Sequence, residues 1–471
     1  MSKFIKFTKE VLEVQHLTKL REIGRQIGVK APAAKNKNEL VVDIMGIQSG
    51  KITPEPQTNR GAPTKISIDV SEFYDKIENY CDEPIKSEVV FHDVNANKKE
   101  LPIVEGVLEQ HVSGYGFLRA NNYENSRDDA YVSLQNIRKY NLRRGDKVKA
   151  YVKVVKEGET AAVQEVITVN DLDPKIFLER DNFDDLIPYY PTDRIRLETD
   201  DSNALALRCI DLFAPLGMGQ RGLIVAPPKT GKTTLLKMIA QSIEKNHKDV
   251  KLIVLLIDER PEEVTDIKRS VKGEVVFSTF DENPDHHIRA TELVINRAKR
   301  LVEVGKNVVI LMDSVTRLAR AYNNVVDSSG KTLSGGLDPA AMYGPKRFFG
   351  AARNIENGGS LTILSTALIE TGSRMDDVIY EEFKGTGNME IHLSRELSER
   401  RIFPAIDLNK SGTRREELLL TKKELETANK LRKTLSERAD ATDSLLDMIK
   451  KTKDNEDLAD RVDAWLKIYS K

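Results

Sequence analysis

A phosphate-binding loop is the strongest chemical signal in the sequence. Its segment, GLIVAPPKTGKTTLLKMIA, begins at Gly222 as an apolar run typical of a strand, continues as a loop over 226–233 and ends in a helical pattern. Such a loop exposes backbone N–H groups, and the helix that follows directs the positive end of its dipole at phosphates. We expect Lys232 to contact the β- and γ-phosphates of ATP and the Thr233 hydroxyl to bind Mg²⁺. The general pattern begins with Gly, and Ala226 occupies that position here.

Two carboxylates follow predicted strands downstream of this loop. The apolar run KNVVILMD ends at Asp313, and KLIVLLIDE ends at Glu259. Because parallel strands present their carboxyl ends at one edge of a sheet, both side chains are expected beside the phosphate-binding loop. Asp313 is a candidate to hold Mg²⁺ through water, and Glu259 is a candidate to orient and deprotonate the water that attacks ATP. The alternative for Glu259 is a surface residue at the end of a strand.

Aromatic residues on another predicted strand suit contacts with single-stranded nucleic acid. In GYGFLR, Tyr115 and Phe117 are two residues apart, so they project from the same face of the strand. Together with Arg119 they are typical of a surface on which bases stack. The alternative is that the two rings fill the core of a small barrel. The glycines that flank Tyr115 favour an open strand that faces a ligand.

Two loops that follow strands near the phosphate-binding loop are further candidates for RNA contacts. One is rich in Gly and Ser, and the other is a short, tight loop. Their candidate residues are Arg320, Tyr322, Lys331, Gly372, Ser373 and Arg374. Both loops can project into the hole of a ring, and ordinary surface loops are the alternative. The sequence leaves these two possibilities open.

The composition is that of a globular protein with several domains. The chain has 471 residues, of which 39% are hydrophobic and 31% charged, and its net charge is −1. Its two cysteines, Cys81 and Cys209, are far apart and lack CxxC spacing, so a disulfide framework or a zinc site is not expected. We find no signal-peptide pattern and no apolar run of membrane-spanning length, and we therefore expect a cytoplasmic protein.

Five segments must position these residues. Helical spacing predicts a helical subdomain over 1–50, and a linker or insertion of unassigned role follows over 51–103. Short β-branched and aromatic runs predict a small barrel over 104–169, with an acidic connector over 170–200. Apolar strands that alternate with helical segments predict a parallel α/β motor domain with C-terminal helices over 201–471.

Taken together, these motifs resemble the transcription termination factor Rho family. The resemblance runs from Gly106 to about Leu420 and is most specific in DERPEEV, EEFKGTGNME and SGTR. It implies a homohexameric ring whose subunits hold a cold-shock-like, oligonucleotide-binding (OB) barrel and a RecA-like P-loop ATPase domain. It also implies an ATP-dependent RNA helicase that uses ATP and Mg²⁺ in the bacterial cytoplasm. The implied partners are single-stranded RNA and the RNA polymerase elongation complex, with no membrane.

The resemblance also implies roles for individual residues. Glu259 is the expected catalytic glutamate, with Lys232 and Arg260 beside it, and Arg414 is the expected arginine finger that reaches into the neighbouring subunit's site. The expected nucleotide-binding residues are Lys229, Thr230, Gly231, Lys232, Thr233, Thr234 and Phe403. The expected RNA-binding residues are Tyr115, Phe117 and Arg119 in the barrel and Tyr322, Lys331, Gly372, Ser373 and Arg374 in the loops.

Some positions depart from the family pattern, and other classes share parts of it. Arg374 stands where Lys is commoner, and Thr160 and Ala161 stand where an Arg–aromatic pair often contributes to the base pocket. Rotary and secretion ATPases use the same core to drive something other than RNA. A recombinase would assemble on DNA. A non-catalytic RNA chaperone would use the barrel alone. RNA-stimulated hydrolysis separates the first of these from the RNA motor.

Overall fold

The computed structural model describes most of the chain. The described residues are Lys9, Leu12, 16–49, 51–53, 101–153, 160–201, 205–437 and 441–469. Most of the predicted 51–103 insertion therefore lies outside them. The chain forms two compact units, 1–92 and 93–471.

The first unit contains a pair of short helices. They are α2 (Leu17–Ile27) and α3 (Lys37–Gln48). Helix α2 ends at Gly28, whose φ of 88° is a left-handed conformation that glycine adopts without steric cost. Asn36 and Glu39 form a capping box that satisfies the first N–H groups of α3. The apolar side chains that pack between the helices are Leu12, Leu20, Ile23, Val29, Leu40, Val41 and Ile44.

The second unit begins with a closed five-stranded barrel. Its strands are β1 (Ile103–Gln110), β2 (Gly116–Arg119), β3 (Ala130–Val132), β4 (Lys147–Lys153) and β5 (Ala161–Val169), and α5 (Leu134–Lys139) follows β3. The order around the barrel is β1-β2-β3-β5-β4, and only the β3–β5 pair is parallel. Leu108, Leu118 and Val148 point inward and are fully buried. A small closed barrel of this kind is the architecture of oligonucleotide-binding folds.

A mostly parallel sheet forms the centre of the motor domain. Its strands are β9 (Arg221–Ala226), β10 (Lys251–Glu259), β11 (Glu274–Thr279), β12 (Asn307–Asp313), β14 (Ser360–Leu368), β15 (Met389–Leu393) and β16 (Ile406–Thr413). They lie in the order β11-β10-β12-β14-β9-β15-β16, and only β16 runs antiparallel to its neighbour. Two short strands extend this sheet by antiparallel pairing, β13 (Arg353–Ile355) on β14 and β6 (Pro188–Tyr189) on β13. A separate two-stranded sheet is formed by β7 (Arg194–Ile195) and β8 (Leu216–Gly217).

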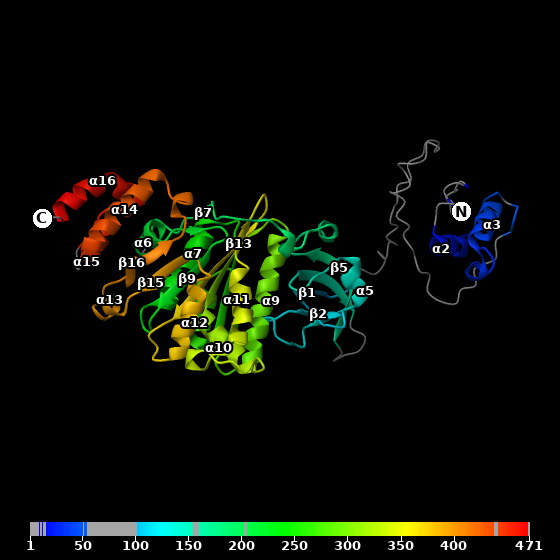
Figure 1. Cartoon of the computed structure of the whole chain (residues 1–471), viewed down its shortest axis with the longest axis horizontal. Helices are drawn as coiled ribbons and strands as arrows, with labels where there is room; N and C mark the ends of the chain where they lie inside the picture. Colours follow the sequence, from blue (N-terminus) through cyan, green and yellow to red (C-terminus); the bar gives the residue numbers. More distant parts are fainter. Residues whose placement is uncertain are drawn as a thin grey trace. The chain divides into compact units, whose positions relative to one another are not determined.

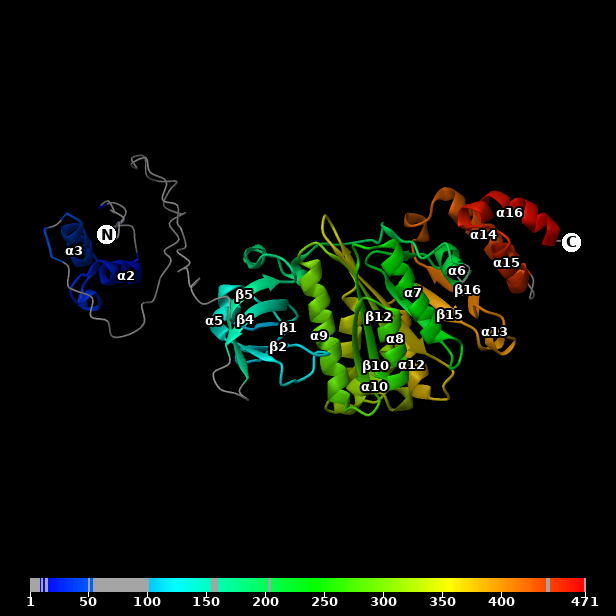
Figure 2. The same ribbon diagram turned by 180° about the vertical axis from the view of Figure 1, so that it is seen from behind.

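Helices cover both faces of this sheet (Figures 1 and 2). One face carries α6 (Leu205–Phe213), α7 (Lys232–Asn246) and α8 (Pro261–Ser270), and the other carries α9 (Pro284–Val302), α10 (Val315–Val325), α11 (Tyr343–Gly350) and α12 (Arg374–Lys384). Because strand side chains alternate, Ile224 packs in one core and Val225 in the other. The predicted fold class, a barrel with an α/β P-loop domain, is confirmed. No helix of the described residues is long and apolar enough to cross a membrane.

The C-terminal helices are attached to the motor domain through a buried arginine. These helices are α14 (Lys422–Glu437), α15 (Ala441–Lys450) and α16 (Asn455–Tyr469), and the short α13 (Arg395–Glu399) precedes them. Arg208 on α6 donates to the carbonyl oxygens of Ile449 at 2.6 Å and Thr452 at 2.9 Å. It also donates to the Thr452 hydroxyl and the Asn455 side chain. The last carbonyls of a helix lack partners within it, so Arg208 satisfies groups at the end of α15.

The barrel is held against helix α9 and strand β11 by polar contacts. Arg289 of α9 forms a two-pronged pair with Glu109 of β1, at 2.8 and 2.6 Å. The amide of Asn122 donates to the Phe277 carbonyl oxygen and accepts from the Phe277 N–H, as a paired strand would. At Gly145, whose φ is 95°, a Cβ would lie 2.4 Å from the backbone of Asn296. Barrel and motor therefore meet through specific contacts that leave no room for a larger residue at Gly145.

We expect Arg208→Met to lower the free energy of unfolding of the motor domain by about 3 kcal/mol, because buried carbonyls lose charged donors. Urea denaturation, with amide hydrogen exchange in α15 as a local probe, measures the effect. The matched control is Lys430→Met, which removes the solvent-exposed ion pair with Asp463 between α14 and α16. This control is expected to cost no more than about 0.5 kcal/mol. Equal losses in the two variants would contradict the role given to Arg208.

Candidate functional site

The phosphate-binding loop spans 227–231 between β9 and α7. Gly231 has a φ of 88°, and a Cβ there would meet no heavy atom within 4 Å, so backbone conformation alone requires glycine. Lys229 also has a positive φ, and its side chain is exposed. The buried Thr230 hydroxyl donates to the Pro227 carbonyl oxygen at 2.7 Å and fixes the loop from inside. The first N–H groups of α7 are thus presented at the loop, as an anion site requires.

The edge of the sheet brings the loop lysine and both strand-end carboxylates together. Lys232 Nζ lies 2.6 Å from each carboxylate oxygen of Asp313 and 3.6 Å from Glu259 Oε2. Asp313 is fully buried and also accepts a hydrogen bond from the Thr366 hydroxyl at 2.7 Å. The burial of these carboxylates is therefore compensated by the ammonium group of Lys232.

Glu259 has the environment of a proton acceptor. Its side chain is buried, and its Oε2 has no hydrogen-bond partner in the described part of the chain. Burial and the charge of Asp313 raise the pKa of Glu259, while Lys232 and Arg317 oppose that rise. Arg317 of α10 lies 3.7 Å from Glu259 and 3.6 Å from Asp258. A carboxylate with one unpaired oxygen and a raised pKa suits general-base chemistry.

Oxygen ligands suitable for Mg²⁺ lie at the same edge. The Thr233 hydroxyl donates to Glu263 Oε2 at 2.8 Å on the first turn of α8. With the carboxylate of Asp313 nearby, the hydroxyl of Thr233 forms a set of hard oxygen donors, which is the chemistry that Mg²⁺ prefers. Arg260 precedes α8, and its side chain is exposed. The residues present therefore fit a nucleotide with its metal ion.

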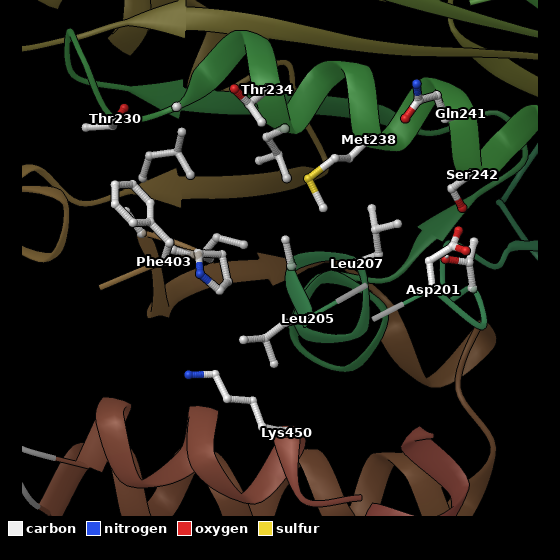
Figure 3. Close-up of a pocket in the computed structure, with 18 of the residues that line it drawn as sticks. Asp201, Leu205, Leu207, Thr230, Thr234, Met238, Gln241, Ser242, Phe403 and Lys450 are labelled. Atoms are coloured by element: carbon white, nitrogen blue, oxygen red, sulfur yellow. Dashed lines mark hydrogen bonds between the residues drawn. The ribbon is translucent and has the colours of Figure 1, made fainter. Parts of the chain in front are cut away.

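A cavity of about 1010 Å³ opens beside the loop (Figure 3). Thr230, Gly231 and Thr234 line one part of it, and the ring of Phe403, which lies in the loop before β16, projects into it. Phe403 is 49% exposed, which leaves its ring accessible to a base. The volume and the aromatic wall suit a nucleoside whose phosphates occupy the loop.

Arg414 lies at the opposite edge of the sheet from the chain's own loop. It follows β16, where Thr413 pairs with Met389, and Met389 in turn pairs with Gly222 near the start of β9. The phosphate-binding loop follows the other end of β9. The side chain of Arg414 is exposed and has no ion pair or hydrogen bond to any described residue. Arg414 is thus free for an anion outside its own subunit's site.

The two candidate RNA loops are joined to each other. Arg320 of α10 forms a two-pronged pair with the buried Asp376 of α12, at 2.8 and 2.7 Å. The hydroxyl of Thr371 donates to the same carboxylate at 2.6 Å. The loop residues Lys331, Gly372 and Arg374 are exposed, and Ser373 is half-buried. The sequence placed Arg320 and Tyr322 on a loop, and this was wrong, because both lie in helix α10. The pair of Arg320 with Asp376 therefore joins α10 to α12, the helices that flank the two loops.

Tyr322 lies apart from the exposed loop residues. It belongs to α10, and its ring packs against Gly344, where a Cβ would come within 2.3 Å of the ring. It lines a cavity of about 320 Å³ together with Glu292 and Arg347. Burial raises the pKa of the Tyr322 hydroxyl to about 12.

Three aromatic rings gather on the outer face of the barrel. Tyr115, Phe117 and Tyr131 have ring centroids 5.8 to 5.9 Å apart in every pairing. Phe117 pairs with Tyr131 across β2 and β3, whereas Gly116 and Leu118 on the alternate face are buried. The rings therefore lie outside the barrel core and form a surface on which bases can stack.

Arg119 is already paired on this face. Its Nε donates to Glu109 at 2.7 Å, and its terminal nitrogen donates to Asp129 at 2.6 Å. Its guanidinium carbon lies 5.1 Å from the centroid of Phe117. Arg119 thus holds the ring of Phe117 in place, and its charge is balanced by two carboxylates.

Three residues that lie at these sites were not predicted from the sequence. They are Arg317, Glu263 and Tyr131. Arg317 lies one helical turn after the strand that ends at Asp313, which is a detectable signal. Glu263 lies in the first turn of a helix that starts at a proline, where acidic residues favour the helix dipole. Tyr131 occupies the exposed middle position of a short strand between two buried residues.

Two family models match the chain. Residues 206–413 match the nucleotide-binding domain of the ATP synthase alpha/beta family, and residues 104–175 match the RNA-binding domain of the Rho termination factor. The motor is therefore an ATPase domain, and the barrel is an RNA-binding domain. A solved ATPase of a bacterial type III secretion system is 24% identical, with a TM-score of 0.50, over 64% of this chain and 95% of that chain. At this identity the likeness shows the shared fold alone.

Full-length relatives extend the match over nearly the whole chain. Transcription termination factor Rho of Bacillus subtilis (strain 168) is 58% identical over 386 residues, covering 81% of this chain and 90% of that protein. The factor of the same name from Aquifex aeolicus (strain VF5) is 46% identical over 467 residues, covering 97% of this chain and 96% of that protein. The chain belongs to the transcription termination factor Rho family.

Proposed function

We propose that the chain is an ATP-dependent RNA translocase and helicase that binds single-stranded nascent RNA and terminates transcription. The observation that supports this proposal best is that one compact unit contains both an ATPase domain and a barrel with a partly exposed cluster of aromatic rings. Its partner in termination is the RNA polymerase elongation complex, and it works in the bacterial cytoplasm. Its domains are a helical subdomain over 1–50, a barrel over 104–169, a connector over 170–200 and a motor over 201–471.

ATP is held at the N-terminus of α7, with its base against Phe403. Bound Mg²⁺ supplies positive charge that neutralises the phosphates, and Thr233 and Asp313 hold it, the latter partly through water. Glu259 accepts a proton from the attacking water at its unpaired Oε2. Lys232 and Arg317 oppose the rise in the pKa of Glu259 and so favour its carboxylate form.

The active site is completed by a second subunit of a homohexamer. Because Arg414 is exposed, unpaired among described residues and at the edge opposite its own loop, it acts as an arginine finger in the neighbouring site. Hydrolysis then depends on ring assembly. The loops carrying Lys331 and Arg374 contact RNA in the central channel, and Tyr115, Phe117 and Tyr131 bind it at the barrel.

A ring ATPase of the rotary or secretion class is the alternative. The fold shared with a type III secretion ATPase is compatible both with a motor that moves RNA and with one that does not. The match of residues 104–175 to an RNA-binding domain, together with the partly exposed rings on the outer face of the barrel, favours RNA.

We expect Glu259→Gln to reduce RNA-stimulated ATP hydrolysis by about 100-fold or more, because the amide cannot accept the proton of water. Steady-state hydrolysis with poly(C) RNA, poly(dC) and no nucleic acid measures the effect, and binding of ATP should persist. Hydrolysis by the parent protein that is indifferent to RNA would contradict the proposed function and favour the secretion-type alternative.

The acid limb of the pH–rate profile is expected to reflect Glu259. A raised pKa means that activity falls, as pH decreases, at a higher pH than an ordinary carboxyl would give. Removing Arg317 removes a charge that lowers this pKa, so Arg317→Met should move the limb to still higher pH. Lys346→Met, which breaks the distant ion pair with Glu382, is the control and should leave the limb in place. An unmoved limb in Arg317→Met would refute the assignment.

Rings assembled from two different variants test whether Arg414 acts in the neighbouring subunit. Lys232→Ala and Arg414→Ala subunits should each be inactive alone, with losses of about 10³-fold or more for the finger. When the two are mixed and reassembled, some interfaces combine an intact loop with an intact Arg414, so RNA-stimulated hydrolysis should partly return. If Arg414 acts within its own subunit, no mixture recovers activity.

A further inference from the structure

A histidine ring lies on the aromatic surface of the barrel. His111 follows the end of β1, and its ring stacks on Tyr115 with centroids 4.8 Å apart and planes at 16°. The side chain of His111 is exposed, whereas Tyr115 beneath it is half-buried. One face of the imidazole is therefore covered by Tyr115, and the other face is available to a planar ligand.

Local hydrogen bonds fix this ring in orientation and in tautomer. The backbone N–H of Ser113 donates to His111 Nδ1 at 3.2 Å. Because a backbone N–H can only donate, Nδ1 accepts, and the proton of the neutral ring lies on Nε2. The hairpin is closed by the His111 N–H to the Tyr115 carbonyl oxygen at 2.7 Å and by the Gly114 N–H to the His111 carbonyl oxygen at 2.9 Å. Nε2 makes no hydrogen bond to any described residue.

The surroundings of His111 are those of a binding surface. Val112 is 98% exposed at the tip of the hairpin, and Leu134, which lies against Gly114, is also exposed. Exposed apolar groups beside polar ones are typical of interaction sites. Arg119, the cation predicted for this face, is occupied by Glu109 and Asp129. A hydrogen-bond donor for RNA at this end of the surface can instead come from His111.

We propose that His111 contacts RNA directly, as a fourth ring of the barrel's aromatic surface. A nucleobase stacks on the face of the imidazole turned away from Tyr115. Because Nε2–H lies in the plane of the ring, it cannot bond to that stacked base, and it donates instead to a phosphate oxygen of an adjacent nucleotide. This inference rests on the proposed binding of RNA by the barrel and adds a residue that holds both a base and the backbone.

Binding of a fluorescein-labelled oligocytidine RNA to the full chain, measured by anisotropy without ATP, tests the proposal. His111→Leu removes the ring and the donor and should weaken binding by about ten-fold. His111→Phe retains a stacking ring and should recover part of that loss. The neighbouring residue supplies a matched control: Ser113→Ala keeps the hairpin backbone, including the Ser113 N–H, and should bind as the parent does.

An abasic scan of the RNA separates direct stacking from support of Tyr115. With the parent protein, removing the base that stacks on His111 should weaken binding, and with His111→Leu the same removal should cost little. If abasic sites weaken binding equally in both proteins, His111 only positions Tyr115 and the proposal is wrong. Unchanged binding in His111→Leu, with loss in Tyr115→Ala, would also overturn it while leaving the barrel as an RNA site. Unchanged binding in both variants would contradict the proposal that this surface of the barrel binds RNA.

Discussion

The contact between Lys232 and Asp313 joins the start of helix α7 to the end of the central strand β12. Both carboxylate oxygens lie 2.6 Å from the ammonium group, in a place where an unpaired charge would be costly. The arrangement exists because parallel strands deliver their last residues to one edge, where β10 also supplies Glu259. The same geometry raises the pKa of Glu259 and leaves one of its oxygens without a hydrogen bond. The charged groups that offset the cost of burial therefore also set the environment of the proposed general base.

A second carboxylate links that motor to the aromatic face of the barrel. Glu109 accepts hydrogen bonds from Arg119, which holds Phe117, and from Arg289 of α9. Burial raises the pKa of Glu109, but the two arginines outweigh this effect and bring it below its ordinary value. The barrel surface and helix α9 are therefore tied to the same ionised side chain. Since α9 also packs on β10 and β12, the strands that carry Glu259 and Asp313, few contacts separate the two sites.

The proposed arginine finger depends on which edge of the sheet each group occupies. The loop and the carboxylates lie at one edge, and Arg414 lies at the other. One chain cannot bring these groups together, and the proposed homohexamer would do so at each interface between subunits. The ion pair of Arg320 with Asp376 joins α10 to α12 beside the two loops that are proposed to contact RNA.

Local patterns in the sequence determined the phosphate-binding loop, the strand-end carboxylates Asp313 and Glu259, and the fold class. They also placed Tyr115 and Phe117 on one face of a strand, but left open whether that face lies in the barrel core. Each depends on a short-range rule: a glycine conformation, an apolar run or a period of two. Only the tertiary structure showed that Arg119 is ion-paired with two carboxylates and that Tyr322 is half-buried. It also placed Arg317 and Glu263 beside the phosphate-binding loop and Tyr131 in the aromatic cluster of the barrel. These facts depend on contacts between residues far apart in the chain, such as Arg317 with Glu259 or Thr233 with Glu263. The sequence gives the type of each side chain, but the residue that the side chain contacts depends on how distant elements pack together.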